Sequence, residues 1–390
     1  MTRAATCIAV TAALIVASCF QPTPHLGQPC TSWCPPPEAC VAGACASTEP
    51  PPGTDGGGSD AAPVTANYMF VTSTKKFLGD FGGLAGGDAW CNSLAQQAGL
   101  PGEYRAWLSD GANSIGAKGR IFETGARGWY RVDGKPFTDQ LDDLTSGTLY
   151  YPPRVTEQGS DIGSDDDLVA TGTFSTGDDL GLNADCEGFT DGSATDVTIA
   201  GYADGGAFGW TDFFDQLTCA SEMRIYCFGI TNQAVVPPPS PPAEPSKLAF
   251  ITAVTPGSGA AGFDAACSSA AQAAGATGTF AAWIATSTFA PGLPAGPWRR
   301  ADNVIVMSAD LQMLAPIDQK ADGTGGAERF AWTGSTAPTQ VASASCNDWT
   351  NASQGPTGLA GFMERSVLAD AWGGSAEACE ASAGVYCLQQ

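Results

Sequence analysis

The sequence predicts an α+β protein in which two copies of one disulfide-stapled domain follow a small cysteine-rich stub. The chain has 390 residues, which is long enough for two domains, and its 43% apolar composition is too high for disorder throughout. Of its 14 cysteines, all but Cys7 and Cys19 fall into three groups of four. An even number is expected of an exported protein with oxidised thiols. The three groups mark the stub and the two domains.

Charge and histidine content exclude several classes of function. Lys and Arg total 17 against 40 Asp and Glu, a formal charge of −23, so the chain lacks the basic face that a nucleic-acid partner requires. Its one histidine, His25, precedes both domains, which excludes histidine triads and histidine-ligated zinc there. Neither domain carries a catalytic motif. We therefore expect a binding protein and not an enzyme.

Residues 1–18 have the pattern of a signal peptide, with Arg3 as the only charge and an apolar run that is too short to span a bilayer. The sequence VASC at 16–19 resembles the lipobox of bacterial lipoproteins, which implies that Cys19 becomes the lipidated first residue. An ordinary cleaved signal with an incidental cysteine is the alternative. Residue 20 is Phe and not the Asp that retains lipoproteins at the inner membrane. We therefore expect attachment through the lipid to the outer membrane or cell surface.

Residues 19–45 hold the lipid attachment site and the stub. The four cysteines of the stub lie in a segment too short for a hydrophobic core of its own, and they are Cys30, Cys34, Cys40 and Cys45. We expect two disulfides among them, with the pairing left open. A four-thiolate zinc site is the alternative, which is disfavoured because an exported chain oxidises its thiols and the CxxC pairs of zinc ribbons are missing.

Two spacers separate the folded parts. Residues 46–65 are rich in Pro, Gly and Asp and have no apolar periodicity. Residues 232–245 contain PPPSPPAEP, whose prolines favour the polyproline II conformation at about 3.1 Å per residue. We expect this second spacer to act as a strut that holds the flanking domains apart by up to roughly 40 Å.

The segments 66–231 and 246–390 are copies of each other. From Cys186 the steps to the next two cysteines are 33 and 8 residues, and from Cys346 they are again 33 and 8. Shifting residues 86–107 by 176 positions gives 12 identities in 22, among them a tryptophan, a cysteine and an aspartate. This period is far above the roughly 20 to 50 residues of solenoid repeats, so each copy is expected to be a complete domain.

Each copy is expected to start with a strand and a helix. Apolar runs at 68–73 and 248–253 predict the strands. In the first copy Asp88 is a candidate N-cap, apolar residues recur at helical spacing, and Gly99 sits where a glycine ends a helix. The second copy repeats this scheme 176 residues later.

Short strands follow in both copies. The runs YRAWLS and FAAWIA place Trp107 and Trp283 in comparable positions, and we expect both tryptophans to be core residues. Each copy ends in an alternating run, at 223–228 and 383–388. This alternation predicts a strand that carries the last cysteine.

Four cysteines in each copy allow three connectivities, and the spacing alone leaves all three open. The segments YMFVTS, GGLAGGDAWC, AWLSD and CASEMRIYC resemble bacterial lipoprotein domains related to endostatin, typified by the leptospiral endostatin-like proteins. The order of the cysteines is similar to that of the C-type lectin-like fold. The resemblance covers both copies and is strongest in the first, since the second lacks the Gly-Gly-Leu run and has shorter loops.

The resemblance implies nested disulfides in each copy, one from the first helix to the last strand and one inside a long loop region. The implied pairs are Cys91 with Cys227, Cys186 with Cys219, Cys267 with Cys387, and Cys346 with Cys379. It implies two C-type lectin-like (endostatin-like) domains, in which disulfides replace part of the order that strands would supply.

Calcium binding is not expected, although an acidic tract keeps it open. Neither copy has the Glu-Pro-Asn or Gln-Pro-Asp loop motif of calcium-dependent lectins, and the nearest matches to their Trp-Asn-Asp motif are WTD at 210–212 and WGG at 372–374. The acidic tract comprises Asp161, Asp165, Asp166, Asp167, Asp178 and Asp179. Its oxygens suit Ca²⁺ but lack EF-hand spacing, so we interpret it as a solvated acidic loop and expect no cofactor.

These observations predict a cell-envelope lipoprotein that presents two C-type lectin-like domains for binding or adhesion. The resemblance implies an extracellular protein ligand, and a polysaccharide is the other possibility. A structural envelope protein without a ligand is one alternative. A glycan hydrolase that works with two carboxylates is another, because the separation of carboxylates in space is invisible in a sequence.

Overall fold

The structure is a computed structural model, and it describes residues 38–41, 44–47, 66–163, 167–181, 184–293 and 295–390. It divides into two compact units, Met1–Gly56 and Gly57–Gln390. In the first unit β1 (Glu38–Val41) and β2 (Ala44–Ser47) pair antiparallel, with Cys40 opposite Cys45. The signal segment, Cys19, Cys30, Cys34 and the spacer at 48–65 lie outside the described residues. No helix in the described part of the chain is long and apolar enough to cross a membrane.

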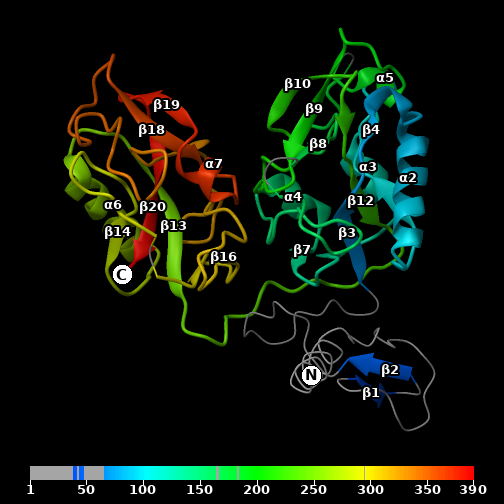
Figure 1. The fold of residues 1–390 in the computed structure, drawn as a ribbon, viewed down its shortest axis with the longest axis horizontal. Coiled ribbons are helices and arrows are strands. Elements are labelled where there is room, and N and C mark those ends of the chain that lie inside the picture. Colours follow the sequence, from blue (N-terminus) through cyan, green and yellow to red (C-terminus); the bar gives the residue numbers. More distant parts are fainter. Residues whose placement is uncertain (1–37, 42–43, 48–65, 164–166, 182–183, 294) are drawn as a thin grey trace, which may run out of the picture. The chain divides into compact units, whose positions relative to one another are not determined.

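The second unit is mostly β-sheet with a few helices and holds both sequence copies, called repeat 1 (66–231) and repeat 2 (246–390) from here on (Figure 1). The main sheet of repeat 1 has the order β5 (Tyr104–Ala106), β12 (Tyr226–Gly229), β3 (Asn67–Val71), β6 (Trp129–Arg131), β7 (Pro136–Thr138). Strand β12 is antiparallel to β3 and β5, and β3 is parallel to β6. The first and last long strands of the repeat are therefore neighbours.

Helix α2 (Gly83–Gln97) packs against this sheet and corrects one sequence interpretation. Asp88 is not its N-cap, because the helix begins five residues earlier at glycines that carry no apolar signal. The Asp88 carboxylate instead accepts hydrogen bonds from the Ala106 amide at 2.8 Å and from Arg120 at 2.6 Å. The helix ends as expected, with Gly99 at a φ of 72° that favours glycine.

The remainder of repeat 1 is built from short elements. They are β4 (Lys76–Phe77), η1 (Leu78–Asp80), α3 (Ala117–Phe122), α4 (Leu141–Ser146), β8 (Leu168–Ala170), α5 (Cys186–Phe189), β9 (Val197–Tyr202), β10 (Phe214–Thr218) and β11 (Glu222–Met223). Strands β10, β9 and β8 form a second, antiparallel sheet, and β4 pairs with β11.

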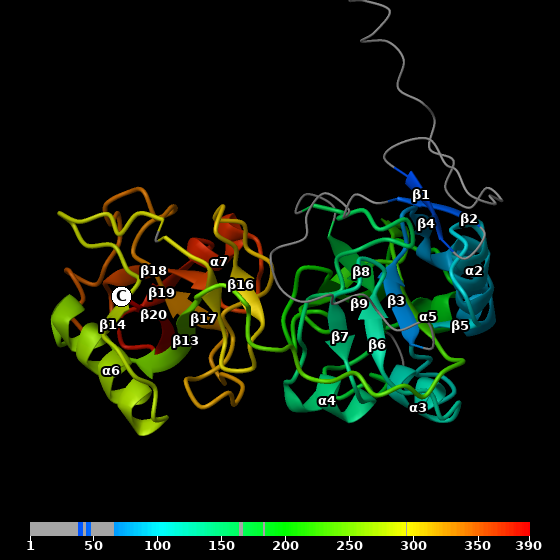
Figure 2. The ribbon, with the colours of Figure 1, turned by 90° about the horizontal axis from the view of Figure 1, so that it is seen from below.

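Repeat 2 has the same pairing around its first and last strands, but its strands join into one sheet, whereas those of repeat 1 form separate sheets. Its elements are β13 (Lys247–Val254), α6 (Gly259–Ala273), β14 (Phe280–Ala282), β15 (Trp298–Arg299), β16 (Ile305–Met307), β17 (Phe330–Trp332), β18 (Thr357–Phe362), α7 (Leu368–Trp372), β19 (Ser375–Ala378) and β20 (Ala383–Gln389). The last strand, β20, is again antiparallel to β13 and β14, and β13 is parallel to β15. Helices α2 and α6 lie on the side of each repeat that faces away from the other repeat in both ribbon views (Figures 1 and 2).

Two disulfides staple each repeat. They join Cys91 to Cys227, Cys186 to Cys219, Cys267 to Cys387, and Cys346 to Cys379, which are the nested pairs that the family resemblance implies. In each repeat, the disulfide with the larger sequence separation joins the helix to the last strand, and the other disulfide closes a loop of 33 residues.

In each repeat, the first cysteine of the disulfide that closes the 33-residue loop lies in a left-handed turn. Residues 186–189 have φ values of 50° to 66°, and residues 346–349 have φ values of 50° to 65°. Left-handed backbone costs an L-residue roughly 1–2 kcal/mol, so other contacts must hold the turns. In repeat 1 Asp185 accepts a hydrogen bond from the Gly111 amide, and in repeat 2 Asp348 accepts one from the Ser287 amide.

Hydrophobic residues cover both faces of each main sheet, because alternate side chains of a strand point to opposite faces. In β3, Phe70 packs under α2, whereas Met69 and Val71 pack on the other side. Trp107 and Trp283 are buried there, as expected, and contact Trp210 and Trp372 respectively at centroid distances of 4.9 and 4.4 Å.

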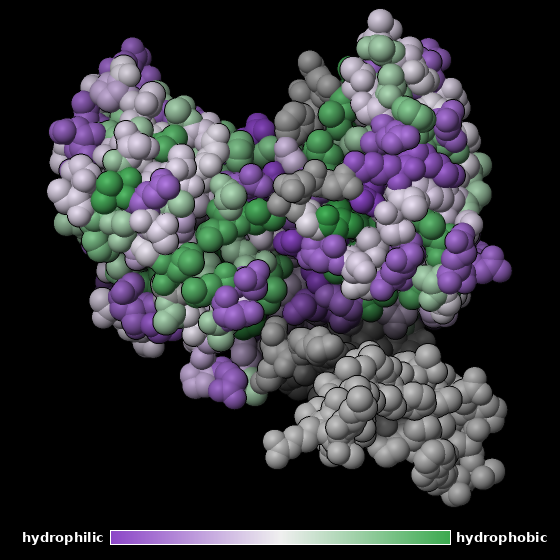
Figure 3. Space-filling model, in the orientation of Figure 1, coloured by the Kyte–Doolittle hydropathy of each residue, from purple (hydrophilic) through white to green (hydrophobic). Residues whose placement is uncertain are grey.

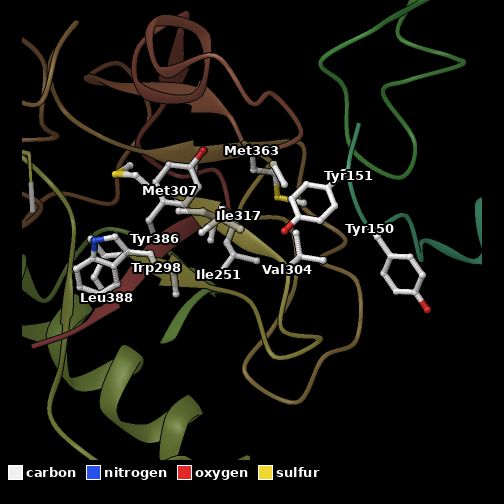
Figure 4. Packing of buried hydrophobic residues seen from close by; sticks show 14 of the residues in the cluster. Tyr150, Tyr151, Ile251, Trp298, Val304, Met307, Ile317, Met363, Tyr386 and Leu388 are labelled. Atoms are coloured by element: carbon white, nitrogen blue, oxygen red, sulfur yellow. The ribbon is translucent and has the colours of Figure 1, made fainter. Parts of the chain in front are cut away.

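The core of repeat 2 continues into repeat 1. Tyr150 and Tyr151 of repeat 1, together with Val236 of the linker, belong to the same buried cluster as Val304 and the residues around it. Figure 4 shows the Tyr151 ring beside Val304, and its hydroxyl accepts a hydrogen bond from the Ile305 amide at 3.1 Å. The two repeats therefore share a hydrophobic core and are not connected by the linker alone.

The expectation that residues 232–245 hold the repeats apart is wrong. The Val236 amide donates to Asp139 of repeat 1 at 2.8 Å, and the Asn303 side chain of repeat 2 donates to the Pro239 carbonyl at 3.2 Å. The prolines set the local conformation of the linker, whereas contacts between the repeats set where its ends lie.

Replacing both members of a disulfide by Ala should destabilise repeat 1 according to the loop that the disulfide closes. We expect the free energy of unfolding to fall by about 5 kcal/mol without Cys91–Cys227 and by about 4 kcal/mol without Cys186–Cys219, because the separations are 136 and 33 residues. Denaturant unfolding under oxidising conditions measures both losses. A greater loss for the shorter loop would contradict the entropic explanation.

Candidate functional site

The acidic tract is not one solvated loop. Asp161 pairs with Arg154 at 2.6 Å, and Asp179 accepts a hydrogen bond from the Gly181 amide. Asp167 is 4% exposed and pairs with Arg365 of repeat 2, so the interpretation as solvated loop is wrong for this residue. Asp165 and Asp166 lie outside the described residues. Among the residues that the structure describes, no three His, Cys, Asp or Glu side chains are grouped as metal ligands.

The segment that most resembles the lectin Trp-Asn-Asp motif is divided between core and surface. Trp210 is fully buried, and the Thr211 hydroxyl accepts a hydrogen bond from the Trp107 indole at 2.8 Å. Asp212 is half-buried and accepts a hydrogen bond from the Ser175 amide. This aspartate borders a cleft between the repeats.

The cleft has a volume of about 420 Å³. Its walls are Phe208, Gly209, Asp212 and Phe213 of repeat 1, with Gly326, Ala327, Glu328, Arg329 and Glu364 of repeat 2. The repeat 1 side is the turn between β9 and β10, and the repeat 2 side consists of the residues before β17 and after β18. Hydrophobic residues also gather over repeat 2 toward its contact with repeat 1 on the face shown in Figure 3. The cleft therefore requires both repeats.

Aromatic rings and one guanidinium form the outer part of the cleft. The Arg329 guanidinium lies over the Phe213 ring at 4.7 Å and 5.9 Å from the Phe330 ring. Phe213 also contacts Phe362 edge to face, with centroids 5.3 Å apart. Phe208 is 36% exposed, which is high for a large apolar side chain. Apolar surface beside a few polar groups is the usual composition of a ligand site.

Glu364 is the buried acid of the cleft. Its Oε2 accepts hydrogen bonds from the amides of Phe208, at 3.2 Å, and Gly209, while Oε1 accepts none from the residues that the structure describes. Burial raises the pKa of Glu364 to about 7, with the nearby Asp318 carboxylate adding to the effect. This group therefore changes charge near neutral pH, inside a cleft.

A buried charge network lies beside the cleft. Arg365 contacts Asp204 at 2.7 Å, Asp167 at 2.5 Å and Asp370 at 2.9 Å. Burial and the nearby Asp204 carboxylate raise the pKa of Asp167 above its ordinary value, although the Arg365 guanidinium acts in the opposite direction. A buried charge costs free energy unless it is paired, so Arg365 is needed where it lies.

A second buried arginine of repeat 2 also reaches repeat 1. Arg300 is fully buried and pairs with Asp318 at 2.6 Å and with Asp302 at 2.8 Å. Its guanidinium also donates to the carbonyls of Leu149 and Tyr150 in repeat 1. The junction therefore combines apolar contact with ion pairs and hydrogen bonds to backbone.

Comparison of the chain with protein-family models and with curated proteins finds no match.

Sequence reasoning missed the residues of the junction. Gly205 and Gly206 stand in repeat 1 where repeat 2 has Arg365 and Ser366, at the offset of 160 that relates the last three cysteines of the two repeats. The change from two glycines to an arginine and a serine was the available signal. The resemblance drew attention to cysteines and loop motifs, and burial of Glu364 cannot be read from a sequence.

Glu364→Gln should stabilise the protein at pH 8 and have little effect at pH 5. The folded pKa of about 7 exceeds the ordinary value of 4.5, so the unfolded chain releases a proton that the folded chain retains. The free energy of unfolding of the wild type therefore falls as pH rises through this window, by on the order of 2–3 kcal/mol, and a glutamine cannot contribute to that fall.

Denaturant unfolding at both pH values measures the effect. Glu328→Gln is the matched control, since Glu328 lines the same cleft and is only half-buried. An advantage of Glu364→Gln that is equal at both pH values would contradict the titration of Glu364.

Proposed function

We propose that this chain is an exported lipoprotein of the bacterial outer membrane or cell surface, in which two C-type lectin-like, endostatin-like domains form one ligand-binding unit. The cleft at the junction of the repeats is the observation that carries the binding role. Four disulfides support export, because they persist in oxidising compartments.

The fold proposal is supported by topology. In both repeats the first and last long strands are neighbours and antiparallel, and a disulfide joins the helix to the last strand. The second disulfide then closes a long region of loops and short strands. This nesting is what a C-type lectin-like domain requires.

The proposed ligand is an extracellular protein or polysaccharide. The cleft offers rings for apolar contact at Phe208 and Phe213, a donor at Arg329, and acceptors at Asp212 and Glu364. Both ligand classes present apolar patches with donors and acceptors beside them. Adhesion follows if such a ligand belongs to another cell or to a matrix.

A glycan hydrolase is the second candidate, and one observation favours it. Glu364, with a pKa of about 7, shares the cleft with Asp212 and Glu328. A general acid works best when its pKa lies near the working pH, and glycoside hydrolysis needs a second carboxylate on the other side of the bond.

The binding proposal predicts that cleft variants lose affinity for the ligand. We would screen the chain by biolayer interferometry against glycans, matrix proteins and envelope extracts, and then compare Phe208→Ala and Arg329→Ala with the wild type. We expect each to weaken binding at least about tenfold, as loss of an aromatic or arginine anchor does. Phe122→Ala is the control, since Phe122 is 69% exposed and lies in α3, away from the cleft.

The outcomes separate the candidates. Equal binding by wild type and cleft variants would move the site elsewhere. Turnover of a glycan that is lost in Glu364→Gln would favour the hydrolase. No binding across the whole panel would favour a structural envelope protein.

The anchor is tested separately. Cys19→Ala should abolish lipidation, because the thioether of the lipid forms on this sulfur. Mass spectrometry of the mature N-terminus reads the result. An unmodified wild-type chain that starts at a residue other than Cys19 would contradict the lipoprotein proposal and leave the binding proposal standing.

A further inference from the structure

The contact between the repeats is reciprocal. The Gly206 amide donates to the Glu364 carbonyl at 2.6 Å, the Ser366 amide donates to the Asp204 carbonyl at 3.1 Å, and Gly205 pairs with Arg365 as an antiparallel bridge. Residues 204–206 and 364–366 occupy the same place in the two repeats, four residues at most after the ends of β9 and β18. One segment therefore pairs with its own counterpart around a local pseudo-two-fold axis, as in the interface of a symmetric dimer.

The side chains on the two sides of this axis are complementary and not equal. Repeat 2 contributes the Arg365 guanidinium, and repeat 1 contributes the Asp167 and Asp204 carboxylates that receive it. At Gly206 a Cβ atom would lie 2.4 Å from Oδ2 of Asp318 and 3.2 Å from Cγ of Pro316. Repeat 1 thus supplies the negative charge that pairs with Arg365 of repeat 2. At Gly206 it also lacks a side chain, which leaves room for Asp318 and Pro316 of repeat 2.

Complementarity of this kind selects unlike repeats. Two copies of repeat 1 would bury Asp167 and Asp204 from both sides without a guanidinium. Two copies of repeat 2 would bring Arg365 against Arg365 at the axis. Unpaired or like charges in a buried contact cost several kcal/mol, so either pairing is strongly disfavoured.

We propose that this surface also binds a second copy of the chain, with repeat 1 of each molecule pairing with repeat 2 of the other in a reciprocal dimer. The backbone pairs of residues 204–206 with 364–366 and the ion pairs of Arg365 with Asp167 and Asp204 join one repeat to the other without the linker at 232–245, so a repeat from another chain can make these contacts as well. The linker favours pairing within one chain because it keeps the partner at millimolar effective concentration. The reciprocal dimer becomes the main form when the linker is too short to let the two repeats of one chain pair with each other.

Deletion of residues 240–244 tests this directly. The full chain also carries Cys19→Ala so that no lipid is attached. We expect the unshortened chain to be a monomer at 10 μM by multi-angle light scattering, and the shortened chain to be a dimer. A shortened chain that is monomeric and keeps the near-UV circular dichroism spectrum of the folded protein would overturn the proposal.

Interface variants show whether that dimer uses the inferred surface. Arg365→Glu and, separately, Gly206→Ala should return the shortened chain to monomers, whereas Gly119→Ala should leave it dimeric. Gly119 is the matched control because a Cβ atom there meets nothing within 4 Å. Persistence of the dimer in both interface variants would mean association through another surface and would overturn the proposal.

A nicked chain guards against misfolding of the variants. A protease site placed at 240–244 is cut after folding, so only non-covalent contacts hold the halves. We expect the halves of the wild type to stay together at 1 μM and the dissociation constant to rise at least about 100-fold with Gly206→Ala or Arg365→Glu. Halves of the wild type that separate at once would show that the contact cannot support exchange.

Discussion

The arrangement of the two repeats depends on the pairing of one buried guanidinium with acids from both repeats. Arg365 lies within 3 Å of Asp167 and Asp204 of repeat 1 and of Asp370 in its own repeat. Burial, and then the nearby Asp204 carboxylate, raise the pKa of Asp167. Such a network adds little net stability compared with apolar packing, but it penalises any arrangement that separates its members. Its main effect is to specify which surfaces meet.

The burial of Glu364 in the cleft depends on the contact between the repeats. Glu364 precedes Arg365 in the chain and reaches the amides of the opposite repeat, so the backbone pairing that places the arginine also buries this acid. Its elevated pKa is a consequence of burial at the junction, and a ligand in the cleft would encounter a group that is partly protonated at neutral pH. The charge state of Glu364 and the union of the repeats are therefore physically coupled.

Within each repeat, disulfides supply part of the stability that a larger hydrophobic core would supply. Strands are short, loops are long, and both repeats contain left-handed turns next to a disulfide. Loop closure by disulfides offsets the entropy of such a chain in the unfolded state. The pairing of the first and last strands and the two disulfides are common to both copies despite different loops.

Much of the internal design of each repeat could be predicted from the sequence. Cysteine spacing, the offset of 176 residues and the apolar runs revealed the duplication, the first helix, the main strands and the buried Trp107 and Trp283, since these features are local or covalent. The start of α2 was missed because its first turn is glycine-rich. Only the tertiary structure decided what happens at the junction. Burial of Glu364, the position of Arg365 and the course of the proline linker all depend on how two distant surfaces meet, and periodicity within either surface carries no information about that contact.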